Sequence, residues 1–372
     1  MTTTALSPDV IQTGSLQIAV TRTPRTRSMP QAADLGFGKI FTDHMFAMDY
    51  EEGRGWFDAR IMPYGPIAMD PGASALHYGQ AMFDGCKAFK AKDGRVLLFR
   101  GRRHAARLSD GAPRLGMVAP GKDEVYEAMT RLVDFERDWV PSEPGTSLYL
   151  RPTLIGTEGF LGVRAAKKYM FFIILSPVGA YYADGMKPVR IWVEKDFIRA
   201  AKGGLGAVKA GANYAASLFA AQTAQQRGYA QVLWLDAIEH KYCEEVGVMN
   251  LFVQMNDEIV TAPLGGTILD GVTRDSVMTL LRDWGHKVTE RRYAFDEIAE
   301  AKKNGTLGEV FGTGTAAVVS PVAEFGHKDG SLSVSDGTVG PLTQKIYATL
   351  TAIQYGDAKD PHGWTEEIKG VA

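Results

Sequence analysis

One lysine stands in a segment made almost entirely of small residues. Lys209 follows Gly-Gly-Leu-Gly-Ala-Val and precedes Ala-Gly-Ala-Asn-Tyr214. Glycine and alanine let the backbone approach a flat ring closely. A lysine that forms imines must be partly desolvated, so that its amine is neutral and nucleophilic. A solvated lysine in a glycine-rich surface loop is the competing interpretation. A phosphate-binding P-loop is excluded, because no Gly-Lys-Ser/Thr follows the glycines.

A pair of carboxylates comes next along the chain. Glu244 and Glu245 follow a strand-like run and a polar turn, and Asn250 and an apolar strand come after them. A carboxylate beside the pyridine nitrogen of a pyridoxal ring favours the protonated ring, which acts as an electron sink. A solvated acidic turn is the alternative. The glycine and the asparagine that follow favour a functional site.

Two Gly/Thr turns and one arginine could hold a phosphate group. The stretch from Gly266 to Ser276 ends a loop and opens a helix at Thr273, where free backbone N–H groups bind anions. The turn around Thr313 offers further N–H and hydroxyl donors. Arg107, in an arginine-rich helix start, could supply a cation. Ordinary helix capping and a solvated helix start explain the same residues equally well at this point.

The elements around these residues alternate between strands and helices. Helices are expected over residues 103–115, 123–139, 214–226 and 273–284, the last with Thr273 as N-cap and Gly285 as C-cap. Strands are expected over 147–152, 169–175, 189–194 and 231–235, with a hairpin at Asp93-Gly94. This order predicts α/β or α+β layers, not a regular βαβ array. The expected organisation is a flexible leader (1–30), a first domain (31–176), a connection (177–188) and a second domain (189–372).

Composition restricts the class of protein. The 372 residues suit two domains, and 41 Lys+Arg against 43 Asp+Glu give no broad field for nucleic acid or an anionic membrane. No apolar run reaches transmembrane length. Two cysteines without a short spacing indicate neither a disulfide framework nor a metal site, which fits the cytoplasm. An organelle transit peptide is the less favoured interpretation of the basic, Thr-rich leader.

With these pieces in order, the chain resembles the branched-chain amino acid aminotransferases, which are fold-type IV pyridoxal-phosphate (PLP) enzymes. The similarity runs from Phe37-Gly-Lys-Ile-Phe to Thr351-Ala-Ile-Gln-Tyr. It includes Leu148-Tyr-Leu-Arg-Pro, Lys209-Ala-Gly-Ala-Asn-Tyr and Gly271-Val-Thr-Arg-Asp-Ser. The resemblance implies a smaller N-terminal α/β domain, a larger C-terminal domain with a barrel-like mixed sheet, and a homodimer.

The resemblance also assigns roles to particular residues. Lys209 corresponds to the lysine that binds PLP as an imine and moves the proton, Tyr214 to the partner of the cofactor's phenolic oxygen, and Glu245 to the partner of its pyridine nitrogen. The positions that correspond to phosphate ligands are Arg107, Val272, Thr273 and Thr313. The positions that correspond to the substrate pocket are Phe37, Tyr78, Phe83, Tyr149, Arg151, Tyr181, Thr315, Ala316 and Leu161, the last reaching into the partner subunit's pocket.

The implied reaction moves the amino group of L-leucine, L-isoleucine or L-valine onto 2-oxoglutarate with ping-pong kinetics. A D-amino acid aminotransferase and an aminodeoxychorismate lyase of the same fold type are the alternatives, and a phosphate-ligand binding protein without chemistry is a third. Ala317 and Ser320 stand where some relatives carry a redox-active Cys-x-x-Cys, so thiol control there is excluded. Asp84 replaces a more usual glutamate, and Val248 a hydroxyl-bearing residue of some relatives.

Overall fold

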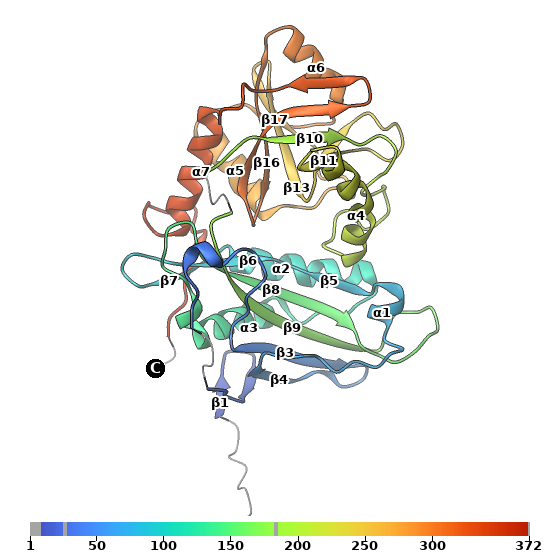
Figure 1. Ribbon diagram of the computed structural model, residues 1–372. Helices are drawn as coiled ribbons and strands as arrows, with labels where there is room; N and C mark the ends of the chain where they lie inside the picture. Colours follow the sequence, from blue (N-terminus) through green and yellow to red (C-terminus); the bar gives the residue numbers. More distant parts are fainter. Residues whose placement is uncertain (1–8, 25–27, 182–184, 371–372) are drawn as a thin grey trace, which may run out of the picture. The chain divides into compact units, whose positions relative to one another are not determined.

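The chain divides into two compact units, each described here by itself (Figure 1). The computed structural model describes residues 9–24, 28–181 and 185–370. The first unit comprises Met1–Tyr181 and Ile353–Ala372, and the second comprises Tyr182–Ala352. The break falls inside the expected connection 177–188. Residues 353–372 group with the first unit, although the sequence analysis assigned them to the second domain. The predicted domain boundaries as a whole stay a prediction.

The first unit is built on a mixed ten-stranded sheet with the order β1-β2-β4-β3-β9-β8-β6-β7-β19, and β5 pairs with β8. Its strands are β1 (Asp9–Gln12), β2 (Gln17–Val20), β3 (His44–Glu51), β4 (Gly55–Pro63), β5 (Ala81–Phe83), β6 (Cys86–Lys90), β7 (Val96–Phe99), β8 (Ser147–Gly156), β9 (Lys168–Val178) and β19 (Thr365–Glu367). Its helices are α1 (Ser74–Tyr78), α2 (Gly101–Gly111) and α3 (Lys122–Phe135), with short 3-10 turns at Ala32–Asp34, Ala112–Leu115 and Arg137–Trp139.

The predicted flexible leader is wrong for residues 9–20. These residues form the antiparallel pair β1–β2, and β2 continues the sheet by pairing with β4. Leu16, Ile18 and Val20 alternate along this segment and are buried in the core of the unit. Alternation of apolar residues places them on one face of a strand, and burying that face stabilises the segment against the sheet.

Strand β8 separates the core from a polar face of the same sheet. Leu148, Leu150 and Leu154 are fully buried in the core cluster, which also includes the apolar side of α3. Side chains alternate along a strand, so Tyr149 and Arg151 point to the opposite face. The sequence expected a short strand ending near Pro152, but β8 runs on to Gly156. Pro152 is accommodated in β8 opposite Ile173 of β9.

The second unit holds a mixed nine-stranded sheet, and part of it closes on itself. The order is β12-β11-β10-β17-β16-β13-β14-β15, and a further pairing of β12 with β13 closes six strands into a ring. This ring confirms the expected barrel-like sheet. Its strands are β10 (Val189–Val193), β11 (Gln231–Leu235), β12 (Cys243–Val246), β13 (Met249–Met255), β14 (Glu258–Thr261), β15 (Val288–Glu290), β16 (Leu307–Gly314), β17 (Val318–His327) and β18 (Gly330–Ser333).

The helices of this part of the chain are α4 (Gly211–Gln226), α5 (Val272–Asp283), α6 (Phe295–Lys303) and α7 (Pro341–Gln354), the last ending in the first unit. The predicted caps of α5 are wrong by one or two residues. Gly271 is the N-cap, in an extended conformation, and Thr273 lies inside the first turn. Trp284 is the C-cap, and Gly285 follows it with a positive φ of 80°.

The relative sizes of the two units are the reverse of the expectation. The first unit is the longer one, because β1, β2 and the C-terminal strand β19 all join its sheet. Among the described residues, no helix is long and apolar enough to cross a membrane.

Candidate active site

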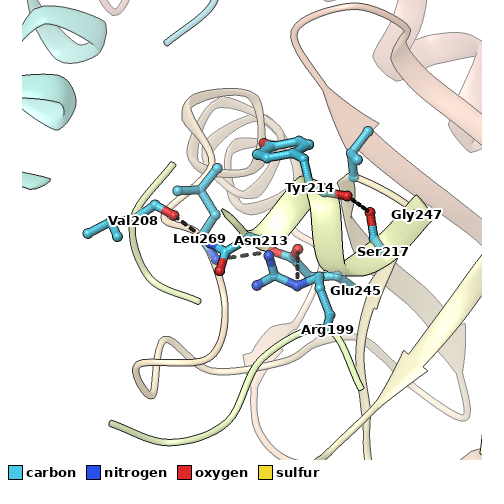
Figure 2. Close-up of a pocket in the computed structure, with 9 residues that line it drawn as sticks. Arg199, Val208, Asn213, Tyr214, Ser217, Glu245, Gly247 and Leu269 are labelled. Carbon is cyan, nitrogen blue, oxygen red and sulfur yellow. Dashed lines mark hydrogen bonds and ion pairs between the residues drawn. The ribbon is translucent and has the colours of Figure 1, made fainter. Parts of the chain in front are cut away.

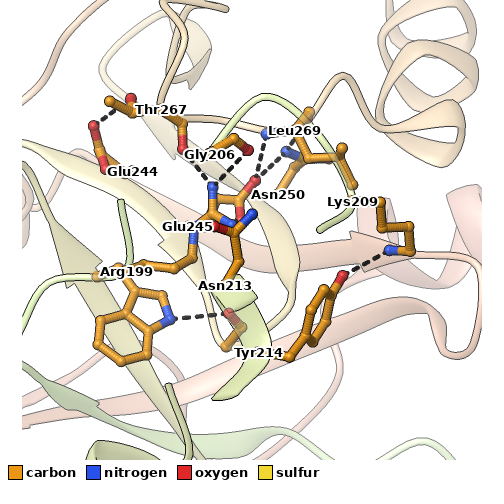
Figure 3. A network of polar contacts seen from close by, with 12 residues as sticks. Arg199, Gly206, Lys209, Asn213, Tyr214, Glu244, Glu245, Asn250, Thr267 and Leu269 are labelled. Atoms are coloured by element: carbon orange, nitrogen blue, oxygen red, sulfur yellow. Dashed lines mark hydrogen bonds and ion pairs between the residues drawn. The ribbon is translucent and has the colours of Figure 1, made fainter. Parts of the chain in front are cut away.

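Lys209 lies in the loop between β10 and α4, and its amine contacts one phenol. The Nζ of Lys209 is 2.8 Å from the hydroxyl oxygen of Tyr214, which stands in the first turn of α4 (Figure 3). Asn213 fixes this loop, since its amide donates to the carbonyl oxygens of Leu205 at 2.9 Å and Val208 at 3.0 Å. The half-buried lysine is therefore held by the fold, unlike a lysine in a freely solvated surface loop.

Glu245 lies on β12 in the same unit and is almost completely buried. Its Oε1 accepts hydrogen bonds from the Nδ2 of Asn250 at 3.1 Å and the backbone N–H of Leu269 at 3.0 Å. Its Oε2 is 3.0 Å from the Nε of Arg199 in an ion pair. Burial raises the pKa of Glu245 above the usual value, and Arg199 is the largest opposing influence. A buried carboxylate held on both oxygens suits a partner for a protonated ring nitrogen.

Glu244, the neighbouring carboxylate, has different partners. Its Oε1 accepts a hydrogen bond of 2.6 Å from the hydroxyl of Thr267, whereas its Oε2 is buried without a hydrogen-bond partner in the described part of the chain. Burial raises the pKa of Glu244, and the hydrogen bond from Thr267 opposes the shift. The solvated acidic turn, which was the alternative for this pair, does not match two buried carboxyl groups.

The start of α5 has the properties of an anion site. Val272 and Thr273 are buried in its first turn, and no side chain caps the helix. The first N–H groups of a helix have no partner within it, so they remain as donors for a ligand. Gly271 is required here, because a Cβ would lie 2.0 Å from the Oδ1 of Asn250.

Thr313 adds a second donor group in the same unit. It lies on β16 directly opposite Asn250 of β13, the asparagine that also contacts Glu245. Its side chain is 1% exposed, and its hydroxyl has no hydrogen-bond partner among the residues that the structure describes. A buried hydroxyl without a partner costs free energy unless a ligand satisfies it. Thr315 and Ala316 follow in the half-buried turn between β16 and β17.

A pocket in the second unit is lined by Tyr214, Ser217, Glu245, Val248 and Leu269, among others (Figure 2). Val248 is exposed at its rim, at the position where the sequence comparison noted the absence of a hydroxyl. The amine of Lys209, the carboxylate of Glu245, the hydroxyl of Thr313 and the uncapped start of α5 fit the aldehyde, ring nitrogen and phosphate of PLP.

The predicted substrate residues of the first unit form a cluster on the polar face of its sheet. The rings of Phe37 and Tyr149 are 5.0 Å apart and edge-to-face. The guanidinium of Arg151 lies 4.5 Å from the ring centroid of Phe83, and its Nη2 is 3.1 Å from the hydroxyl of Tyr149. Gly85 makes room for this tyrosine, because a Cβ there would lie 1.9 Å from the Tyr149 hydroxyl.

Three other predicted residues of this unit lie outside that cluster's printed contacts. The hydroxyl of Tyr78 donates a hydrogen bond to the carbonyl oxygen of Leu161. The side chain of Leu161 is exposed, and Tyr181 is half exposed at the end of the unit. The structure therefore groups Phe37, Phe83, Tyr149 and Arg151.

Arg107 projects from α2 and forms a two-pronged ion pair. Its Nε and Nη2 are each 2.7 Å from an oxygen of Asp84, and His104 contacts the same carboxylate at 2.7 Å. Asp84 is completely buried. Burial opposes its ionisation, but the charges and hydrogen bonds of Arg107 and His104 outweigh burial and lower the pKa of Asp84. Arg107 belongs to the first unit, whereas the other predicted phosphate ligands belong to the second.

Comparison with known proteins agrees with this chemistry. Residues 82–325 match the family model for amino-transferase class IV. The chain is also 50% identical over 360 residues to branched-chain-amino-acid aminotransferase 2 of Bacillus subtilis (strain 168), a match that covers 97% of this chain and 98% of that protein. The chain belongs to the class IV aminotransferases.

Solved structures support the fold of this class IV aminotransferase. The branched-chain amino acid aminotransferase of Escherichia coli superposes with a TM-score of 0.73 at 26% identity, covering 88% of this chain and 99% of that one. The branched-chain aminotransferase of the archaeon Thermoproteus uzoniensis, solved with norvaline, gives 0.71 at 25% identity, covering 87% and 100%. A further similar branched-chain enzyme was solved with pyridoxamine 5'-phosphate. The expected fold-type IV architecture is thus confirmed. The chain is a PLP-dependent aminotransferase that acts on small molecules.

The sequence analysis missed several residues that organise this site. Arg199 contacts Glu245, Thr267 contacts Glu244, and His104 with Asp84 holds Arg107. No spacing rule separates Arg199 from the other cations, because its partner Glu245 is distant in sequence. The buried pair of Asp84 and Arg107 had one sequence signal, since an acidic residue beside Phe83 was noted as a replacement for glutamate.

Proposed function

We propose that this aminotransferase reversibly transfers the amino group of L-leucine, L-isoleucine or L-valine to 2-oxoglutarate, giving branched 2-oxo acids and L-glutamate. One observation carries the proposal: the similarity to the Bacillus subtilis enzyme, whose name states this substrate class, extends over nearly the whole of both chains. That similarity includes residues before the family model begins, where Phe37 lies. The D-amino acid aminotransferase and the lyase are the alternatives.

The residues of the second unit would divide the chemistry among them. Bound PLP supplies an electron sink for the bond broken at the substrate's α-carbon. Lys209 carries the cofactor as an imine at rest, and its Nζ takes and returns the transferred proton. Tyr214 orients that amine through its hydroxyl, and Glu245 holds a proton on the ring nitrogen. Contacts within one unit support these roles.

A phosphate group would be held by backbone and side-chain donors. The N–H groups of Val272 and Thr273 at the start of α5 and the hydroxyl of Thr313 supply neutral donors. Arg107 supplies the positive charge. Its fork is already oriented by Asp84, and such preorganisation lowers the entropy lost when a ligand binds.

The substrate pocket must accept two different side chains. The rings of Phe37, Phe83 and Tyr181 would contact the aliphatic side chain of leucine. Arg151 and Tyr149 would meet the distal carboxylate of glutamate. Arg151 lies against the aromatic rings, which supports this dual role, because a stacked guanidinium presents an apolar face and a charged edge. The turn at Thr315 and Ala316 would receive the α-carboxylate.

We also propose a homodimer that works in the cytoplasm. Leu161 is 64% exposed and Val163 88% exposed on one loop of the first unit, which is unusual for side chains that would otherwise lose water contact on folding. A partner subunit would cover them, with Leu161 (and Tyr78, which contacts it) near the partner's pocket. Both cysteines are free and buried, which supports a reducing compartment. Light scattering with size-exclusion chromatography would measure the mass, and a monomer at micromolar concentration would contradict the dimer.

An initial-rate panel tests the function directly. L-leucine, L-isoleucine, L-valine, L-glutamate, L-aspartate and D-alanine are each supplied with an oxo-acid acceptor, which is 4-methyl-2-oxopentanoate for glutamate and aspartate and 2-oxoglutarate for the others. High rates for the three branched donors and glutamate alone are expected. Activity with D-alanine, or with none of the donors, would move the function to one of the alternatives.

A further inference from the structure

Arg199 contacts three separate parts of the candidate site with one guanidinium (Figure 3). Its Nε is 3.0 Å from the Oε2 of Glu245, and its side chain is only 10% exposed. Its Nη2 donates hydrogen bonds to the carbonyl oxygen of Gly206, at 3.2 Å, and to that of Thr267. Gly206 belongs to the lysine loop, and Thr267 belongs to the loop that leads into α5. None of the roles assigned above uses this arginine.

The two loops meet closely where Arg199 joins them. A Cβ on Gly206 would lie 2.4 Å from the carbonyl oxygen of Thr267, so the backbones are in contact at this point. Thr267 is held from its other end as well, because its hydroxyl donates to Glu244. The arginine therefore occupies the junction between the segment that carries Lys209 and the segment that opens the predicted phosphate site.

The electrostatics of Glu245 depend on the same arginine. Burial raises the pKa of this carboxyl group, and Arg199 is the first of the groups that lower it, before the N–H of Leu269, Lys209 and Arg274. Glu244 also faces this region and carries the same sign of charge when ionised. A neutral carboxyl group would lose most of its ability to hold a proton on a ring nitrogen.

We propose that Arg199 is a positioning residue for transamination, which keeps Glu245 ionised and in one orientation and joins it to the loops of Lys209 and Thr267. The proposal rests on the proposed function only in taking Glu245 as the partner of the cofactor's ring nitrogen. The planar fork of arginine fits this task, because its Nε and Nη2 reach different acceptors. A lysine would restore the charge but could not reach all three acceptors in the same geometry.

Two variants separate the charge of Arg199 from its fork. In Arg199→Met, the pKa of Glu245 should rise, so that Glu245 is ionised only at higher pH. The acid limb of the kcat–pH profile should then move upward by about one pH unit or more. PLP affinity, measured by equilibrium dialysis of the apoenzyme, should fall at least about tenfold. Arg199→Lys should return most of the acid limb to its original position while leaving PLP affinity lowered.

Arg291→Met is the matched control. Arg291 is also a partly buried arginine of the second unit, and it pairs with Glu258 and Glu297. Its loss should affect stability without moving the acid limb or PLP affinity. If Arg199 has only a structural role, its variants should behave like Arg291→Met, and that result would overturn the proposal.

A double-mutant cycle covers the case in which Arg199→Met does not fold. The effect of Arg199→Lys on PLP affinity should become much smaller in the Glu245→Gln background, because the partner charge is gone. Equal effects in both backgrounds would refute the coupling. Dialysis needs no amino-acid substrate, and the pH profile can use any donor that the wild type accepts. Failure of the branched-chain assignment would therefore be seen in the wild type, separately from these results.

Discussion

The amine of Lys209 lies 2.8 Å from the hydroxyl oxygen of Tyr214, across the junction between a loop and the first turn of α4. The two residues are close in sequence, so the contact depends on the local turn at Ala210 more than on distant packing. Lys209 is thus held in place before any cofactor is considered. This contact explains why the small residues around Lys209 do not give a disordered loop.

Tyr214→Phe should weaken catalysis without unfolding the enzyme. The change removes one hydroxyl that contacts Lys209 and leaves the ring in place, so kcat should fall by roughly fivefold to tenfold, which corresponds to one neutral hydrogen bond. The pH dependence of the cofactor's visible absorbance should shift as well. An unchanged spectrum and rate would show that the hydroxyl has no role at the reacting atoms.

Lys209→Ala should abolish turnover while PLP still binds weakly. The loss should exceed about 10²-fold, because the variant lacks both the covalent attachment and the proton-transfer group. Lys202→Ala, in the same loop but exposed, is the control and should keep the wild-type rate. Wild-type turnover in Lys209→Ala would contradict the site assignment.

The two neighbouring glutamates should respond differently to amide substitution. Glu245→Gln should lower kcat by about 10-fold to 100-fold, since an amide cannot supply the charge that a hydrogen-bonded ion pair needs. Glu244→Gln should have a small effect, because burial already favours the neutral form of Glu244 and an amide can still accept the hydrogen bond of Thr267. Steady-state rates near neutral pH provide the measurement. The reverse ranking would assign the ring nitrogen to Glu244.

Asp84→Asn should destabilise the first unit near neutral pH. The change leaves Arg107 without its buried partner, a loss of about 3–5 kcal/mol in the free energy of unfolding. Because the pKa of Asp84 is lowered in the folded state, its stabilisation is complete above the pKa of the unfolded chain and is lost as the pH falls toward the folded pKa. Urea unfolding should therefore show a gap between wild type and variant that narrows below about pH 4.

A surface ion pair provides the comparison for Asp84. Asp93 pairs with Arg95 at 2.7 Å, and both side chains are exposed. Asp93→Asn should leave the urea midpoint nearly unchanged, because water screens exposed charges. An equal loss in both variants would mean that the burial of Asp84 does not determine its contribution.

Gly271→Ala should disturb the start of α5. The added Cβ would lie 2.0 Å from the Oδ1 of Asn250, which also contacts Glu245, so the substitution should cost about 1–3 kcal/mol of stability and lower PLP affinity. Gly265→Ala, in the same loop, meets no atom closer than 3.9 Å and serves as the control. Thermal unfolding of apoenzyme and dialysis of PLP would measure both effects. Equal behaviour of the two variants would contradict the steric argument.

The sequence by itself determined the local features of this protein. The small residues around Lys209, the strand of β8 and the helix that begins after Gly271 follow from residue types and short spacings. Its motifs in order predicted the family and the barrel-like sheet, both of which were confirmed. The leader was the main local error, because alternation over Leu16, Ile18 and Val20 could stabilise a strand only if a sheet edge was available to receive it.

Only the tertiary structure decided which charges meet. Glu245 is paired with Arg199, and Asp84 with Arg107, across separations along the chain that no pattern specifies. It also decided the caps of α5, where the lack of a side chain at Gly271 leaves space for Asn250. These contacts depend on which strands pair and on how deeply each group is buried. Both are set by long-range packing, which short sequence patterns do not encode.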